Sequence, residues 1–235
     1  MRNEQPLGKI IGVSAWSPGI INERHPDLFW YGIHGTETLF TLMGPGCQTV
    51  QRTQTDGAEL VVGVWDEGRI GTFRGIRTGK QDYGAFVFAE KGIADAGKYD
   101  GYKPLVEEIC KFFRTNQPPV DPLETIEIIA FLEAADVSKE RNGQPVALVE
   151  IIEKAKKAVL IPVGLQVSSD GTLQMNGEKI EISALSETLD SLIAEKPNAH
   201  VRVILRAEKG TPHEIILSVC NNLGKAVLAN FLYER

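Results

Sequence analysis

The feature that most constrains the fold is a run of four short β segments separated by glycine turns. Residues 47–55, 58–65, 69–77 and 83–90 alternate in polarity or are rich in β-branched and aromatic residues, which is typical of strands. The turns that separate them are Asp56-Gly57, Glu67-Gly68 and Thr78-Gly79. Because consecutive strands joined by short turns pair antiparallel, this segment predicts an antiparallel meander.

Segments with helical spacing of apolar residues flank these strands. We expect a strand at 9–16, a helix at 26–43 that ends at Gly44-Pro45-Gly46, and two further helices at 102–114 and 125–139. The last two helices should pack on one face of the sheet, and a short amphipathic segment follows at 148–158. The prediction is therefore an α+β fold with a mostly antiparallel sheet covered by helices on one face.

The pattern changes after residue 158, where we place a domain boundary. Residues 160–167, 172–175, 200–206 and 226–232 are typical of strands, and residues 183–195 and 212–223 are typical of helices. This order predicts a small ββαβαβ domain of about 75 residues, which is large enough to fold alone. The chain is thus expected to contain two domains, 1–158 and 159–235.

Composition excludes several classes of function. A net charge of −6 with no basic stripe argues against a nucleic-acid partner, and no apolar run approaches the length of a membrane span. The three cysteines are far apart, which favours a reducing, cytoplasmic location. His25, His200 and His213 have no metal-ligand spacing, so no metal site is expected.

The segment 24–40 carries the most specific motif of the chain. A histidine, His34, follows Gly-Ile and precedes an acid, Glu37, by three positions. This pattern resembles the substrate-domain helix of the Gfo/Idh/MocA family of nicotinamide-dependent oxidoreductases. The run 63–77 resembles the sheet of that domain, and the Pro-Pro-Val turn in 112–120 resembles its closing helices. The resemblance covers roughly residues 8–158.

The resemblance implies that His34 faces the substrate and that the intact family uses NAD(P). The residues before this helix are too few for a Rossmann unit, and the sequence contains no Gly-x-Gly-x-x-Gly turn. We therefore expect the substrate-binding and oligomerisation part of a truncated oxidoreductase, with no cofactor bound by this chain alone. Hydride transfer would then require a separate nucleotide-binding chain. The chain also departs from the family, because Trp30 stands where members often carry an aspartate.

Eight residues form the candidate site. His34 is the candidate catalytic residue, since imidazole exchanges protons near pH 7, although a lone histidine is usually structural. The candidate substrate-binding residues are Trp30, Tyr31, Glu37, Arg74, Arg77, Lys80 and Tyr83. The aromatic side chains are suited to cover the apolar side of a sugar ring, with core packing as the alternative. The charged side chains are suited to contact substrate oxygens or to orient His34, with a solvated surface as the alternative.

A second resemblance covers roughly residues 162–233. Residues 167–178, 185–194, 201–208 and 211–213 are similar to the periplasmic domain of ExbD/TolR biopolymer-transport proteins. That family carries a membrane helix with a proton-carrying aspartate, which this sequence does not show, so the resemblance implies only a compact module that pairs or binds a peptide or glycan.

Two hypotheses follow. The first is a part of an oxidoreductase that binds a sugar-like molecule and pairs through the first sheet into a homo-oligomer; the alternative is a non-catalytic assembly or binding protein.

Overall fold

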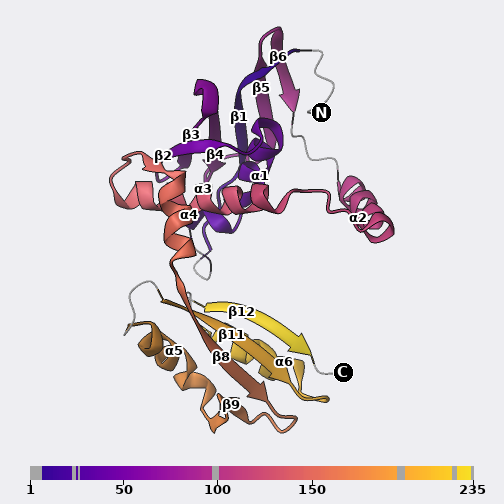
Figure 1. The fold of residues 1–235 in the computed structure, drawn as a ribbon, viewed down its shortest axis with the longest axis vertical. Coiled ribbons are helices and arrows are strands. Elements are labelled where there is room, and N and C mark those ends of the chain that lie inside the picture. Colours follow the sequence, from indigo (N-terminus) through magenta and orange to yellow (C-terminus); the bar gives the residue numbers. More distant parts are fainter. Residues whose placement is uncertain are drawn as a thin grey trace. The chain divides into compact units, whose positions relative to one another are not determined.

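The structure is a computed structural model that describes residues 7–22, 25, 27–96, 101–194, 199–223 and 227–233. The chain divides into two compact units, Met1–Ile152 and Glu153–Arg235. Each unit is built on its own β-sheet (Figure 1). The division between them lies inside a helix, a few residues before the boundary that the sequence predicts at Val159.

The first unit holds a seven-stranded sheet in the order β6-β5-β1-β4-β3-β2-β7. Its strands are β1 (Ile10–Pro18), β2 (Cys47–Thr55), β3 (Ala58–Trp65), β4 (Ile70–Ile76), β5 (Gly84–Ala89), β6 (Gly92–Ala96) and β7 (Val146–Ala147). The mostly antiparallel sheet is confirmed, and β2, β3 and β4 form a meander. The expected pairing of the fourth segment with the third is wrong. Strand β1 lies between β4 and β5, parallel to β4, because the long connection from Arg77 to Tyr83 lets the chain cross over it.

The helices of the first unit are η1 (Asp27–Phe29), α1 (Gly32–Met43), η2 (Asp66–Gly68), α2 (Lys103–Thr115), α3 (Pro122–Glu140) and α4 (Leu148–Lys156). Of these helices, α1 and α3 pack on one face of the sheet. Asp121 caps α3 by accepting the Leu123 N–H at 2.9 Å. The rings of Phe40 on α1 and Phe131 on α3 are 5.6 Å apart, and both pack against Trp65 of the sheet. This aromatic trio forms the centre of the core.

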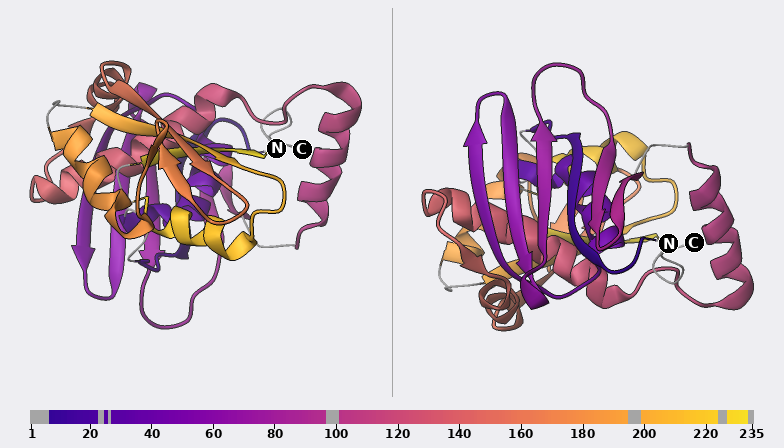
Figure 2. Two further views of the ribbon diagram at one scale, coloured as in Figure 1. Left: turned by 90° about the horizontal axis from the view of Figure 1, so that it is seen from below. Right: turned by 90° about the horizontal axis from the view of Figure 1, so that it is seen from above.

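Helix α2 differs from the prediction. It forms where the sequence indicates a helix, but none of its residues is buried, and the side chain of Phe113 is 78% exposed. Figures 1 and 2 draw α2 clear of the sheet. The expectation that both late helices cover the sheet is thus wrong for α2. Helices α1 and α3 already occupy the space above Trp65 and Phe73, where an apolar helix face would gain burial.

The second unit holds a five-stranded sheet in the order β10-β9-β8-β11-β12. Its elements are β8 (Val159–Val167), β9 (Leu173–Met175), β10 (Glu178–Lys179), η3 (Ile182–Ala184), α5 (Leu185–Ala194), β11 (Ala199–Ala207), α6 (His213–Asn221) and β12 (Val227–Tyr233). Strands β8, β11 and β12 are parallel, and β9 is antiparallel to β8. The predicted ββαβαβ order is confirmed, with the two-residue strand β10 added.

Candidate functional site

Helix α1 lies unusually close to the sheet. A Cβ atom on Gly35 would be 2.4 Å from the Phe73 ring and 2.8 Å from Ser17 Oγ, so only glycine permits this approach. The adjacent residue His34 therefore leaves the first turn of α1 at the surface of the sheet layer, with half of its side chain exposed. The close packing of Gly35 against Phe73 thus fixes the position of the candidate catalytic side chain.

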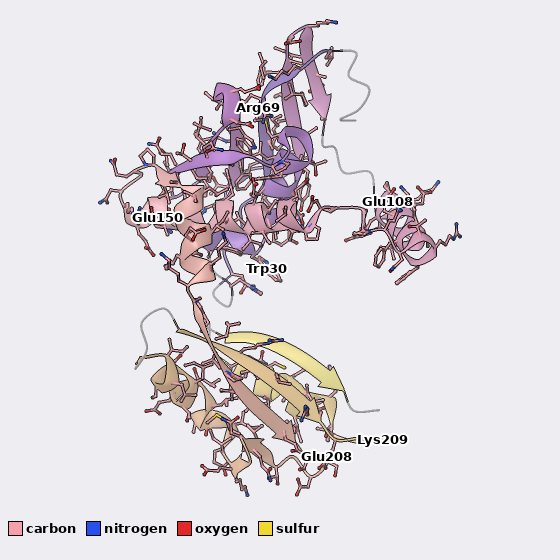
Figure 3. All side chains as sticks on the ribbon, in the orientation of Figure 1. Trp30, Arg69, Glu108, Glu150, Glu208 and Lys209 are labelled. Carbon is pink, nitrogen blue, oxygen red and sulfur yellow. The ribbon has the colours of Figure 1, made fainter. Side chains whose placement is uncertain are left out.

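His34 lies between two tyrosines. Its ring centroid is 5.8 Å from that of Tyr31, which precedes α1, and 6.3 Å from that of Tyr83, which precedes β5. Trp30 continues the cluster at 6.0 Å from Tyr31 and stacks on His25 at 4.4 Å. Trp30 is 40% exposed and is labelled in Figure 3. The structure therefore brings together three aromatic residues and the histidine that the sequence places in the site.

Glu37 lies one turn after His34 on α1. Its Oε2 is 3.3 Å from His34 Nδ1, and about half of each side chain is exposed. A pair this exposed adds little to the stability of the fold, so its main effect is to orient the His34 ring. When Nδ1–H donates to the carboxylate, Nε2 is left as a proton acceptor that faces away from Glu37.

A hollow of about 510 Å³ opens beside Tyr83. It is lined by Trp16, Gln81, Asp82, Tyr83, Gly84, Ala85, Asp95 and Ala96. Burial raises the pKa of Tyr83, and nearby tyrosines add to this effect, so its hydroxyl stays protonated at neutral pH. The sequence analysis missed the carboxylates Asp82 and Asp95, because only the pairing of β5 with β6 and the path of the preceding loop bring them together.

The predicted basic residues do not join this cluster. Arg74 is exposed on β4, opposite Trp16 and Leu60, on the sheet face that the helices leave open. Lys80 is almost fully exposed and lies 4.0 Å from Asp82. Arg77 follows β4 and forms ion pairs with the buried Glu59 and with Asp27. The structure thus separates these three cations from one another. Lys80 lies near Asp82, and Arg74 is paired across strands with Trp16; both of these partners line the hollow.

Arg77 belongs to a buried charge cluster that the sequence analysis did not identify. At its centre the fully buried Arg52 contacts three carboxylates, Glu59 at 2.7 Å, Asp136 at 2.5 Å and Asp27 at 3.1 Å. Lys139 adds a contact of 2.7 Å to Asp27. A signal was present in β2, since Arg52 shares a face with the buried Val50 two positions earlier.

The cluster holds the segment that leads into the aromatic residues. Burial raises the pKa of Asp27, but hydrogen bonds from Arg52 and Lys139 outweigh this and lower it. Asp136 behaves in the opposite way: burial and the nearby Asp27 raise its pKa to about 7, although Arg52 favours its ionised form. Asp27 begins the turn η1, directly before Trp30 and Tyr31. Ion pairing of Asp27 therefore anchors the entrance to α1 and the aromatic surface.

The described part of the chain also bears on metal binding and on membrane insertion. There, no three histidine, cysteine or acidic side chains gather closely enough to hold a metal ion. Of the helices that the structure describes, none combines the length and the apolar character needed to cross a bilayer.

Comparison with known proteins gives two partial similarities. The model of the family "Biopolymer transport protein ExbD/TolR" matches residues 126–232, from within α3 to β12. This match begins well before the region that the sequence predicts, and it crosses both units. No curated protein matches the sequence.

Several solved structures similar to this chain are named as oxidoreductases or dehydrogenases. One is a putative NADPH-dependent oxidoreductase from Desulfitobacterium hafniense DCB-2, with 13% identity, a TM-score of 0.49, and coverage of 62% of this chain and 59% of that one. Another is myo-inositol dehydrogenase from Lactobacillus casei in complex with NAD(H) and myo-inositol, with 14% identity, a TM-score of 0.49, and coverage of 60% and 55%. The chain spans little more than half the length of each. At these values the similarity identifies neither substrate nor mechanism.

The described residues at the carboxyl ends of β8 and β11 do not fit a dinucleotide. Parallel strands offer such a site at their carboxyl ends, where loop N–H groups bind the pyrophosphate. After β8 and β11 the N–H of Ser169 instead donates to Glu208 at 3.0 Å, so a carboxylate occupies the position that an anion would need. Pro212, which has no N–H, precedes α6. No step through NAD(P) is therefore assigned to this chain.

Proposed function

We propose that the first unit binds a sugar-like or hydroxylated small molecule at the surface formed by Trp30, Tyr31, His34 and Tyr83. The observation that carries this proposal is the position of His34 between two tyrosines, one of which lines a hollow with two carboxylates. Aromatic faces cover the apolar side of a sugar ring, and carboxylates accept hydrogen bonds from its hydroxyl groups. One side of this surface thus offers both kinds of contact.

His34 has one chemical role in this proposal. With Nδ1–H directed to Glu37, its Nε2 accepts a proton from a bound hydroxyl group or returns it. Oxidation or reduction of the carbon that carries this hydroxyl group requires a nicotinamide. We propose that a separate nucleotide-binding chain supplies it, because the residues of the proposed surface do not form a pyrophosphate site. The chain alone is accordingly proposed to bind substrate without turning it over.

The open face of the first sheet is proposed to pair two copies of the chain. Five large apolar side chains are exposed on it: Leu60, Val64, Ile70, Phe86 and Ile93. Exposed apolar patches of this kind mark interaction surfaces, and a twofold pair uses the same patch on both copies. A cytoplasmic location is part of this proposal, and the exposed, unpaired Cys110 supports it.

The second candidate function is non-catalytic. The family match over residues 126–232 and the position of β12 at one edge of its sheet favour assembly or binding through the second unit. An edge strand has unpaired N–H and C=O groups that can pair with another chain. In this alternative the first unit also serves assembly, through its open sheet face.

Titration with myo-inositol, followed by saturation-transfer NMR and calorimetry, distinguishes the two functions. We expect binding by the wild-type chain and a loss of at least about tenfold in affinity for Tyr83→Ala, because the ring forms one wall of the surface. Phe113→Ala is the matched control, since that ring is exposed on α2, outside the proposed surface. No binding by the wild type, or equal affinity of both variants, favours the non-catalytic alternative.

A further inference from the structure

The sheet of the second unit has one face covered by helices and one face open. Residues with side chains on the covered face of β8 and β11, such as Leu165 and Leu205, are 1% and 2% exposed, and they pack with Leu185 and Val219 of the helices. Side chains alternate along a strand, so the residues between them lie on the opposite face. Gln166 and Arg206 are accordingly exposed.

Strand register places four polar side chains in one line across this open face. Arg206 on β11 is paired with Gln166 on β8, Gln166 with Gln174 on β9, and Gln174 with Lys179 on β10. Directly paired residues share a face of the sheet. We call these four residues the cation–amide row. Because neighbouring strands are about 4.8 Å apart, the Cα atoms of Arg206 and Lys179, three strand spacings apart, are separated by about 14 Å.

The row borders a hollow of about 270 Å³. Its lining is Gly164, Leu165, Gln166, Gln174, Asn176, Gly177, Ile204 and Arg206. A Cβ atom on Gly164 would meet only Asn176 Oδ1, at an ordinary contact distance of 3.6 Å. The fold therefore does not require glycine at this strand position, and its missing side chain is what leaves the hollow open.

One exposed carboxylate, Asp170, lies near this face: hydrogen bonds from Thr172 lower its pKa, and the charge of Lys179 lowers it further. Among the described residues, neither Arg206 nor Lys179 forms an ion pair. Asp170, in the turn after β8, accepts the Thr172 N–H at 2.9 Å, and Glu178 is paired with Met175, which packs against the core. A positive face on a chain of net charge −6 favours an anionic ligand.

We infer that the cation–amide row binds an acidic peptide segment in an extended conformation. Carboxylates four residues apart on one face of an extended peptide are about 13 Å apart, which matches the spacing of Arg206 and Lys179. The guanidinium group pairs with a carboxylate through two parallel hydrogen bonds, and the amides of Gln166 and Gln174 both donate to and accept from peptide groups. Ile204 adds apolar contact from within the hollow.

Two other ligands fit these residues less well. A glycan is usually held by an aromatic face, and none of the residues that line this hollow is aromatic. Nucleic acid requires more cations than one row provides. The inference rests on the second candidate function, because it names a ligand for the second unit, and it is independent of the surface around His34.

The test uses the full chain and a capped peptide of alternating glutamate and alanine, with its glutamine analogue as the uncharged control. Binding is followed by amide chemical shifts and by calorimetry at low and high salt. We expect the acidic peptide alone to bind, with shifts at Gln166 and Gln174. The double variant Arg206→Gln with Lys179→Gln should weaken binding at least about tenfold, because two charge-assisted contacts are lost.

Two variants separate a specific site from general attraction. Lys209→Gln removes one positive charge from the exposed turn after β11, outside the row, and should change affinity less than about twofold (Figure 3). Gly164→Val fills the hollow without changing charge, and valine suits a strand, so it should weaken binding while the unit stays folded. Equal effects of Lys209→Gln and Arg206→Gln, or equal binding of the glutamine peptide, overturn the inference. Binding of an anionic polysaccharide in place of the peptide also overturns it. Myo-inositol titration of the same samples reports separately on the proposed sugar site.

Discussion

The guanidinium group of Arg52 and the carboxylate of Glu59 form an ion pair, Nε to Oε2 at 2.7 Å, in which neither side chain is exposed to solvent. The two residues lie on neighbouring strands β2 and β3, between the sheet and α3. Removing charges from water is costly, and such a pair is maintained only when every partner is present. Arg52 therefore ties together the hairpin, the turn η1 through Asp27, and α3 through Asp136.

Removing one member of this pair should destabilise the first unit strongly. Arg52→Met leaves Glu59 buried without its main partner, and breaking a buried pair typically costs about 3 to 5 kcal/mol. Urea unfolding, monitored by tryptophan fluorescence, measures this change. Arg141→Met is the control, because Arg141 and Glu150 form a pair on the surface and no measurable change is expected. Glu150 is labelled in Figure 3. A small effect of Arg52→Met would show that the cluster adds nothing to stability.

The raised pKa of Asp136 predicts an unusual dependence of stability on pH. Since the folded state holds this proton up to about pH 7 and the unfolded chain releases it near 3.8, the folded state binds more protons between these values. The free energy of unfolding should therefore fall as pH rises from about 4 to 7. Each pKa unit corresponds to about 1.4 kcal/mol, which bounds the effect at about 4 kcal/mol.

Asp136→Asn tests this sign. The variant lacks the titrating group. The free energy of unfolding of the variant minus that of the wild type should therefore increase as pH rises from 5 to about 8. Asp27 has a lowered pKa, and its own contribution is lost only as pH falls below its unfolded value, outside this window. A constant difference between variant and wild type from pH 5 to 8 would contradict the assignment to Asp136.

The two phenylalanines Phe113 and Phe131 should differ sharply in their effect on stability. Phe131 is fully buried against Phe40 and Trp65, so Phe131→Ala should cost about 3 to 5 kcal/mol in the free energy of unfolding. Phe113→Ser should change it little, because this ring is 78% exposed on α2. Denaturant titration of both variants provides the comparison. A large loss for Phe113→Ser would mean that α2 packs against the first unit.

Residues 159–235 should fold without the rest of the chain. Their core is formed by residues of the same segment, among them Leu165, Leu189 and Val203, each at most 1% exposed. Expressing residues 1–158 and 159–235 separately, and recording amide NMR spectra of each, tests this two-domain proposal. If the shorter piece gives a collapsed spectrum that becomes dispersed only after the longer piece is added, the two segments form one cooperative fold.

NADH and NADPH are expected not to bind the isolated chain. The sequence contains no Gly-x-Gly-x-x-Gly turn. In addition, the N–H of Ser169, which a phosphate oxygen could otherwise accept, donates to the carboxylate of Glu208. Fluorescence titration of either nucleotide provides the measurement. Saturable binding in the micromolar range would require a dinucleotide site that the described residues do not form.

The sequence alone determined those features that depend on neighbouring residues. The strands β2 and β3 begin and end where the alternation predicts, because Asp56-Gly57 makes a local two-residue turn between them. The strand and helix order of the second unit follows from similar short-range signals. The placement of His34 on a helix was also predicted, but the expected helix starts at residue 26, and only the structure shows that α1 begins at Gly32 and that His34 lies in its first turn.

Only the tertiary structure decided which faces and charges meet. Alternation shows that Arg52 lies on the same face as Val50, but it does not show that Asp27, 25 positions away, and Asp136, 84 positions away, would be its partners. The insertion of β1 beside β4, the exposure of α2 and the withdrawal of Arg77 from the aromatic surface have the same cause. Burial and Coulomb interactions act between groups that are close in space, and the local pattern of a chain does not specify which distant segments come together.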